Sequence, residues 1–578
     1  MKAYPPHMTA TLTRTRLLVA LVAISTLVLA LAAAGGVVPG LFVDDSPDRP
    51  DDPTTEDTVG YVNGYWYDDE LPVDDRDDAV VDDDELEPVV YRSMARVEKI
   101  RNMTFEDDVP VEVISREEYQ TEHKDIFLET TEDEQLIQNV TYETLFMVDR
   151  DTDAGDEFES MYGGAVGGYY DPETDRIVVV SDTTETPELD ETVLGHELVH
   201  ALQDQQFDLS SYDRMTIDQD VATNGLIEGD AAWVETEYET RCSDEWACAQ
   251  PGESEPNSEQ FSQLNWGLYM TLYQPYNDGS AYIDSLREDG GWAAVNAAYD
   301  DPPTSSSTVI HSDEEREPVE VTVEDRSGDA WVPLEVDGEP ARQTVGEAAM
   351  VSMFGADIHD RSQPSVIDSE AMLADGLSGY DYDQPYTDGW TGDELAVYVD
   401  ATVDDPTATD TGYVWETEWR SSEDAQQFVT GYLDLLEIHD AEPVADRQDT
   451  YTVDDEYPGA YAIDRDGETV TIVRAPSVDD LDEINDGAAP EGDDTLERVA
   501  VDTSDGDDGG TDDDDSDSLA GFAVPGTVLG VSIGIFVAKT RDGTVRAWIA
   551  HRRALTRPDS APSVDSGGGS DSQRRGAA

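Results

Sequence analysis

The segment of this chain that most constrains its fold is Thr192–Gln206, with the sequence TVLGHELVHALQDQQ. Its apolar residues recur at the spacing of a buried helix: Val193, Leu194, Leu198, Val199, Ala201 and Leu202. Residues four positions apart lie on one face of a helix, about 5–6 Å from each other. We therefore expect His196 and His200 to direct their imidazoles toward one point, with Glu197 one step around the helix.

Two imidazoles and a carboxylate in the order H-E-x-x-H are typical of a zinc site that activates water. In this interpretation His196 and His200 bind Zn²⁺, and Glu197 is the general base that contacts a water on the ion. The alternative is a chance match to the motif, with both histidines satisfied inside a helical core. The apolar pattern on both sides of the motif favours the metal interpretation.

A third ligand has to come from elsewhere in the chain. A metzincin site continues as H-E-x-x-H-x-x-G-x-x-H, but this chain has Gln203 and Gln206 at the last two positions of that pattern. The next helical segment, Asp218–Glu239, carries Glu228 among small residues that would allow close packing against the first helix. A carboxylate on a packed face costs on the order of several kcal/mol unless a cation pairs with it, so we predict Glu228 as the ligand. The alternatives are Asp204, Asp220 and Glu235, and a solvated position for Glu228 also stays open.

A short hairpin is predicted just before the motif helix. Tyr169-Tyr170 and Ile177–Val180 have the character of paired strands on either side of a turn at Asp171–Asp175. Thr186-Pro187, followed by acidic residues, predicts the start of the helix. In zinc peptidases a strand beside the site binds extended peptide through backbone hydrogen bonds. Ile177–Val180 is the predicted substrate strand, with an ordinary core strand as the alternative.

The HELVH motif, followed by a helix bearing NGLIEGDA, resembles the gluzincin class of zinc metallopeptidases. In that class two histidines and a later glutamate bind zinc, and the glutamate of the motif is the general base. The resemblance implies the zinc ligands His196, His200 and Glu228, and the base Glu197. Over roughly residues 90–320 the chain is also similar to bacterial and archaeal surface proteins known only as presumed metallopeptidases, from GGYYDPETDRIVVV to TSSSTVIH.

The same resemblance makes His311 a candidate catalytic residue. Some gluzincins use a downstream histidine to stabilise the oxyanion of the tetrahedral intermediate. The relatives have a sequence like S-T-E-Q-x-L-H-P at this point, whereas this chain has STVIHS over residues 307–312. A structural or surface histidine is the alternative.

The acidity of the chain limits its partners. The formal net charge is -100, from 133 Asp and Glu against 33 Lys and Arg, so a nucleic-acid backbone would be repelled. High charge with few apolar residues usually indicates disorder, but 10 Trp and 26 Tyr in periodic segments indicate a folded protein. A folded protein this acidic resembles those of halophilic archaea, in which carboxylates keep the surface hydrated in concentrated salt.

Each end of the chain combines basic residues with an apolar run. Residues 1–16 contain three Lys or Arg and no acid, and residues 539–578 contain eight against four Asp. We expect a signal anchor or a cleaved signal peptide over residues 1–43, and a transmembrane helix over 519–538. By the positive-inside rule both ends then lie in the cytoplasm and the acidic bulk lies outside, anchored to the lipid bilayer. A buried core segment is the alternative for residues 519–538.

Composition also suggests how the chain is divided. The predicted segments are an acidic linker over 44–90, a zincin-like domain over 91–317, an α+β module over 318–476, an acidic stalk over 477–518 and a basic cytoplasmic tail over 539–578. In the α+β module, Val319–Val323 is among the predicted strands. Cys242 and Cys248 are the only cysteines, and in an exported chain we expect them to form a disulfide, with two free thiols as the alternative.

The sequence thus predicts an α+β fold flanked by transmembrane segments. A zincin-like catalytic domain, made of a β-hairpin or sheet, the motif helix and a second ligand helix, precedes a small α+β module. The predicted function is that of a membrane-anchored, extracytoplasmic zinc metallopeptidase that acts on proteins or peptides. The alternatives are a non-catalytic cell-surface protein with a zincin-like fold, and a zinc hydrolase that cleaves another kind of bond.

Overall fold

The computed structural model describes residues 49–501 except 77, 123–130, 166, 173, 213, 252–263, 337, 360–363, 374–378 and 455. Contacts divide the chain into Met1–Pro53 and Thr54–Ala578, and every element below belongs to the second unit. The described residues contain no helix long and apolar enough to cross a membrane. Both predicted apolar runs, in 1–43 and 519–538, lie outside the described residues.

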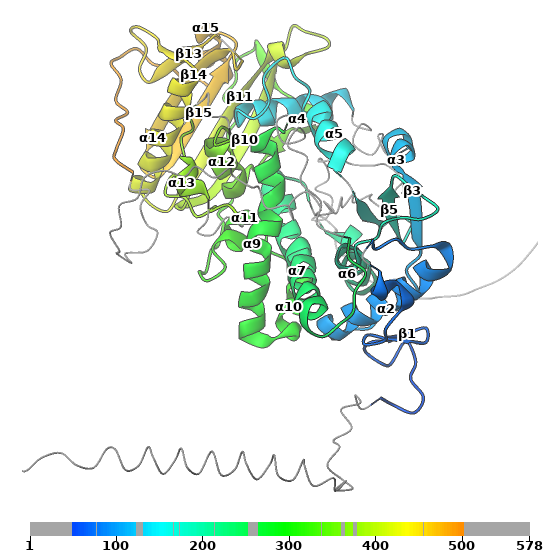
Figure 1. Ribbon diagram of the computed structural model, residues 1–578. Coiled ribbons are helices and arrows are strands. Elements are labelled where there is room, and N and C mark those ends of the chain that lie inside the picture. Colours follow the sequence, from blue (N-terminus) through cyan, green and yellow to red (C-terminus); the bar gives the residue numbers. More distant parts are fainter. Residues whose placement is uncertain are drawn as a thin grey trace, which may run out of the picture. The chain divides into compact units, whose positions relative to one another are not determined.

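The first part of this unit is mainly helical (Figure 1). Its elements are β1 (Tyr61–Val62), β2 (Tyr65–Trp66), η1 (Pro72–Asp75), α2 (Asp83–Arg101), β3 (Val111–Ser115), α3 (Arg116–Glu122), α4 (Glu132–Thr144), α5 (Ala154–Ala165), β4 (Gly168–Asp171), β5 (Arg176–Ser181), α6 (Glu191–Phe207), η3 (Leu209–Ser211), α7 (Ile217–Asp244), α9 (Trp266–Gly290), α10 (Trp292–Ala298) and α11 (Ser306–Ile310).

A three-stranded sheet with the order β3-β5-β4 lies beside helix α6, in contact with it through β4 and β5. Strand β5 is central, since it pairs in parallel with β3 and antiparallel with β4. Its residues Ile177–Val180 are all buried, as expected for a strand covered on both faces. The predicted hairpin is confirmed as the β4–β5 pair.

Helix α6 begins later than the sequence predicted. Its N-cap is Asp190, whose side chain accepts a hydrogen bond from the Thr192 amide at 3.0 Å. Pro187 cannot be in the first turn, because its carbonyl oxygen accepts from the Val81 amide and Glu188 forms a β-bridge with Val80. The sequence predicted Thr186 as the N-cap, four residues before Asp190, because several residues in this segment have side chains that can cap a helix.

Helices α7 and α9 run side by side in close contact (Figure 1). Gly229 and Gly279 face each other so closely that a Cβ on Gly229 would lie 2.4 Å from the Gly279 carbonyl carbon. Gly225 likewise contacts Val309 of α11. Helix α7 packs against α6, as its small residues predicted, and these two glycines in addition admit α9 and α11.

The second part of the unit is an α+β region, yellow-green to orange in Figure 1. Its elements are β6 (Trp331–Pro333), β7 (Glu335–Val336), β8 (Glu339–Pro340), β9 (Arg342–Gln343), α12 (Gly346–Gly355), α13 (Ser369–Met372), β10 (Trp390–Asp400), η4 (Ala408–Asp410), β11 (Thr411–Trp419), α14 (Ser422–Ile438), β12 (Glu442–Pro443), β13 (Thr450–Val453), β14 (Gly459–Asp466), β15 (Thr469–Ala475) and α15 (Val478–Ile484).

Apart from β7 and β8, which pair separately, these strands form one antiparallel sheet with the order β12-β13-β14-β15-β11-β10-β6, and β9 also pairs with β10. Alternate residues face opposite sides. Leu395 and Val397 belong to a large core that includes α12 and α14, whereas Ala396 and Tyr398 pack in a smaller core with α15. The predicted α+β module is present, but Val319–Val323 is not a strand.

Two predicted boundaries are corrected by burial. Val62, Val73 and Val81, inside the predicted linker 44–90, belong to the hydrophobic core around α6. Ile484 of α15 is also buried, so the predicted stalk 477–518 begins within the folded region. Both segments are mainly acidic, so their composition predicted a linker, but a small number of apolar residues in each pack into a hydrophobic core.

The helical region and the sheet region share their largest core. It joins Val140 of α4, Val221 of α7 and Met270 of α9 to Phe354 of α12 and Trp415 of β11. The predicted boundary between 317 and 318 therefore does not separate two independent cores. The disulfide between Cys242 and Cys248 is present, as the sequence predicted, and lies at the end of α7.

Candidate metal centre

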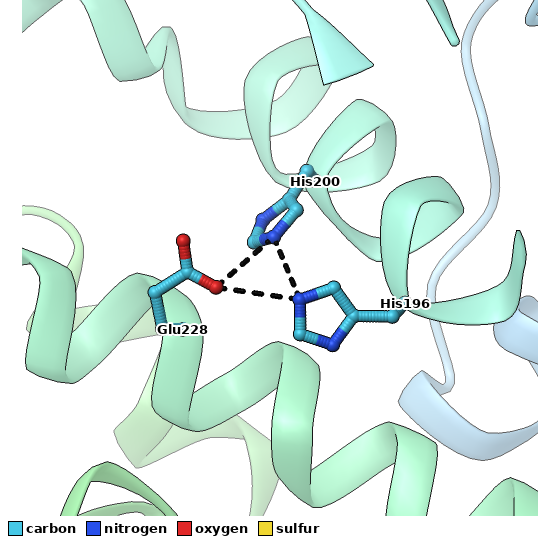
Figure 2. Close-up of side chains that lie close together, drawn as sticks. All are labelled: His196, His200 and Glu228. Atoms are coloured by element: carbon cyan, nitrogen blue, oxygen red, sulfur yellow. Dashed lines mark hydrogen bonds and ion pairs between the residues drawn. The ribbon is translucent and has the colours of Figure 1, made fainter. Parts of the chain in front are cut away.

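Two helices bring three side chains together. Helix α6 supplies His196 and His200, one turn apart, and α7 supplies Glu228. The two Nε2 atoms are 3.1 Å apart, and Glu228 Oε2 lies 3.3 Å from His196 Nε2 and 3.2 Å from His200 Nε2 (Figure 2). His196, His200 and Glu228 are thus a group that could hold a metal ion, as predicted.

The hydrogen bonds of the outer imidazole nitrogens show why a cation fits this group. His196 Nδ1 lies 3.0 Å from Glu235 Oε2, and His200 Nδ1 lies 2.9 Å from Gln203 Oε1. Both partners are oxygen acceptors, so each Nδ1 donates a proton, and a ring in its neutral, metal-binding form keeps its lone pair on Nε2. Two lone pairs and a carboxylate oxygen then converge on one point, and a cation satisfies all three donors.

The burial of these three side chains adds to the argument for a cation between them. The residues His196, His200 and Glu228 are at most 2 % exposed, so bulk solvent does not screen the three electron-pair donors from one another. Two imidazoles and a carboxylate are a donor set that zinc accepts, and three protein ligands are typical of a site that keeps one position for water or substrate.

The three side chains also shift one another's pKa. Burial alone raises the pKa of Glu228, but the facing His200 and His196 outweigh it and lower the pKa to about 2. Burial lowers the pKa of His196, but Glu228 and Glu235 raise it well above its usual value. Burial also lowers the pKa of His200, and Glu228 reverses this to a net rise. In the metal-free protein the two histidines therefore hold their protons more tightly, and a metal ion has to displace these protons when it binds.

Glu197 lies next to this group and is held by the adjacent sheet. Its Oε2 accepts a hydrogen bond of 2.8 Å from the Tyr170 amide of β4, and the side chain is buried. Its Oε1 is buried too and has no hydrogen-bond partner among the described residues. Burial raises the pKa of Glu197 above its usual range. A buried carboxylate with one fixed and one uncommitted oxygen is suited to accept and return a proton.

The alternative third ligands have other partners. Glu235 contacts His196 from behind, through the outer nitrogen. Asp204 accepts from the Tyr170 hydroxyl at 2.9 Å, and Asp220 pairs with Arg214 at 3.2 Å. Glu228 is therefore the carboxylate that completes the group, and Glu235 orients one of its histidines.

His311 lies in a separate group at the end of α11. Its Nε2 is 3.0 Å from Glu347 Oε1, and Asp383 and Asp388 each approach the ring at 3.9 Å. These distances resemble a metal site, but both carboxylate oxygens of Asp388 already accept from arginines. Arg316 bonds Oδ1 at 2.8 Å and Arg420 bonds Oδ2 at 2.6 Å. Guanidinium groups therefore supply the positive charge here.

Three residues around the centre were not predicted from the sequence. Gln203 holds His200, Tyr170 holds Glu197 through its amide, and the Tyr276 ring of α9 stacks at 6.3 Å from the His196 ring. Gln203 had a signal, because it lies three residues after His200 and so on the same helix face. The other two depend on contacts between segments far apart in the sequence.

Comparison with known proteins adds one match. Residues 333–485 match a family described as a domain of unknown function, DUF8575, which corresponds to most of the α+β region. No curated protein matches the chain. No solved structure matches it either.

Proposed function

We propose that this protein is a zinc-dependent metallopeptidase that works outside the cytoplasm and is anchored to the membrane. The observation that carries the proposal is the buried convergence of His196, His200 and Glu228, with Glu197 beside them. A metal site that only stabilised a fold would have four protein ligands and no need for a buried carboxylate that keeps one oxygen uncommitted. Among the described residues the group has three ligands and a neighbouring carboxylate, which fits hydrolysis better.

Zinc bound by His196, His200 and Glu228 would polarise a substrate carbonyl and lower the pKa of a water. Glu197 supplies the proton transfers. Its Oε1 takes a proton from the attacking water and passes it to the amine that leaves when the peptide bond breaks. The Tyr170 amide holds Oε2 in place throughout, so the carboxylate does not have to reorient between the two transfers.

The position of strand β4 supports an extended peptide as substrate. Strand β5, which contains the predicted substrate strand Ile177–Val180, cannot bind a peptide in this way, because it is paired on both sides and has no free edge. Among the described residues β4 is an outer strand, and its Tyr170 amide faces α6 instead of β5. An extended peptide aligned along this edge would lie against the helix that carries the motif.

Aromatic side chains of α9 support an apolar substrate position beside the metal centre. The Tyr276 ring lies 6.3 Å from the His196 ring, and the Tyr273 ring lies 6.4 Å from that of Tyr276. Both tyrosines are partly exposed. In a protein of net charge -100, an uncharged aromatic surface next to the site favours apolar side chains of a peptide.

The membrane attachment and the extracytoplasmic location in this proposal come from the charge pattern of the chain ends. A disulfide between Cys242 and Cys248 agrees with an oxidising compartment. Protease protection of intact cells tests the location. Full-length protein should be degraded by an added protease outside the cell, and an entirely protected protein would contradict the proposal.

Replacing Glu197 with glutamine tests the catalytic step. The E197Q variant should bind one zinc per chain but lose roughly 10²–10⁴-fold in hydrolysis, because the amide cannot accept the proton. The full chain is purified in detergent and high salt, its zinc is measured by elemental analysis, and its digestion of unlabelled proteins is followed with and without a chelator. The matched control is E132Q, since Glu132 is exposed on α4. Hydrolysis by E197Q at a rate near that of the wild type would refute this mechanism.

A further inference from the structure

The two histidines of the centre are oriented by chemically different partners. His196 Nδ1 contacts a carboxylate, Glu235, whose side chain is 21 % exposed. His200 Nδ1 contacts an amide, Gln203, which is 1 % exposed. A carboxylate accepts hydrogen bonds whichever oxygen it presents, but an amide accepts at one end and donates at the other. The orientation of the Gln203 amide therefore matters.

Backbone geometry fixes that orientation. Gln203 Nε2 lies 2.9 Å from the carbonyl oxygen of Ile227, the residue before the ligand Glu228. A carbonyl oxygen can only accept, so this end of the amide has to be the nitrogen. The amide oxygen then faces His200 Nδ1 and has to receive a proton from it. One backbone carbonyl of α7 thus dictates which nitrogen of His200 keeps the lone pair.

A buried chain of polar groups holds the amide from its far side. Gln203 Nε2 also donates to the Tyr299 hydroxyl at 2.9 Å, and that hydroxyl donates to Asp230 Oδ2 at 2.8 Å. Arg101 Nε completes the chain with a bond of 3.0 Å to Asp230. All four residues are at most 4 % exposed. The chain links α2, α6, α7 and the segment after α10.

We propose that Gln203 is a positioning residue of the metal centre, which fixes His200 with its Nε2 lone pair toward the ion and joins this ligand to the Glu228 helix. The inference rests on the metal site but not on the bond that the protein cleaves. Tyr299 is the next member of the chain, and it supports Gln203 without touching a ligand. Outer contacts of this kind typically change metal affinity by about 10–100-fold.

Zinc affinity measured by competition with a chelator tests the inference in graded variants of the full chain. Q203A should bind zinc about 10–100-fold more weakly, since His200 loses the acceptor that fixes its tautomer. Q203E should weaken binding as well, because its carboxylate faces the Ile227 carbonyl, which can only accept. Y299F should have a smaller effect than Q203A, because Gln203 keeps the Ile227 contact.

Controls separate positioning from general stability. Q206A is matched, since Gln206 lies on the same helix and its amide donates to the Thr104 carbonyl instead of contacting a ligand. The melting temperature of each metal-free variant, and the absorption bands of its cobalt-substituted form, are measured beside zinc affinity. Q203A should shift the cobalt bands while Q206A leaves them unchanged.

The outcomes distinguish this inference from the proposed function. Wild-type zinc affinity in Q203A, or an equal loss in Q206A, overturns the positioning role and leaves the metal site standing. A zinc-loaded wild type without peptidase activity overturns the proposed function, whereas weaker zinc binding in Q203A would still support Gln203. A wild type that binds no zinc overturns both.

Discussion

At the scale of single residues, Glu228 determines how strongly the two histidines of the metal centre hold protons. The facing histidines hold its pKa at about 2, so it stays ionised, and its charge in turn raises the pKa of both histidines. A folded-state pKa that is raised means that protons are held more tightly, so zinc has to displace them. Zinc affinity should therefore fall as the pH falls through the raised pKa of the histidines.

The E228Q variant tests this coupling. We expect zinc affinity to fall by roughly a hundredfold or more, since loss of a ligand should exceed the loss of an outer contact. The remaining pH dependence should move to lower pH, because Glu228 no longer raises the histidine pKa values. The measurement is chelator competition at several pH values and constant salt, with E132Q as control. A pH dependence identical to that of the wild type would argue against the coupling.

The part of the metal centre that lies within one helix could be predicted from the sequence. His196, Glu197 and His200 lie within a single helix, so their spacing alone fixes their relative positions. Glu228 was found because a carboxylate among small apolar residues needs a partner. The separate group of His311 with Glu347 was not predictable, because it depends on how α11 packs against α12.

At the scale of elements, the contact between α7 and α9 brings Glu228 of one helix and Tyr276 of the other next to His196. Gly229 is the neighbour of Glu228 and touches the backbone of Gly279. Backbone atoms cannot move aside as side chains do, so this contact fixes the distance between the helices. The sequence predicted that the small residues of α7 allow packing against α6, and the two helices do pack, but it did not indicate the closer contact with α9, which is non-local.

The G229A variant tests the importance of this close contact. We expect a loss of at least about 2 kcal/mol in the free energy of unfolding, because the added methyl group overpacks the helix pair. Zinc affinity should fall as well, since Glu228 shifts with α7. The measurement is denaturant unfolding in high salt. G290A is the control, at the exposed end of α9, where a change within about 1 kcal/mol is expected. If G229A were as stable as G290A, the helices would have more room than the structure shows.

At the scale of the whole molecule, the helical and sheet regions meet around buried acids. Asp218 at the start of α7 accepts from the Ser306 amide at 2.8 Å, and its own amide donates to the Thr344 carbonyl. Asp393 of β10 accepts from the amides of Val345 and Gly346. The sequence indicated both regions, but it did not indicate that they share a core. In so acidic a chain, nothing distinguished the buried Asp218 and Asp393 from the exposed acids.

Burial raises the pKa of Asp218 to about 7, well above an ordinary aspartate, and this makes the junction of the two regions sensitive to pH. An acid whose pKa is higher in the folded than in the unfolded state stabilises the fold at low pH. That contribution is lost as the pH rises from about 4 to about 7. One pKa unit corresponds to about 1.4 kcal/mol, so Asp218 alone can change stability by a few kcal/mol over this window.

The D218N variant removes this titration and keeps an oxygen that can accept from Ser306. The free energy of unfolding of D218N minus that of the wild type should therefore rise with pH between about 4 and about 7, by up to a few kcal/mol. Denaturant unfolding at constant high salt measures it, with D133N, an exposed acid on α4, as the control. A difference that stays constant over this pH range would mean that Asp218 is ionised in the folded protein, and its hydrogen bonds would then have to stabilise a buried charge.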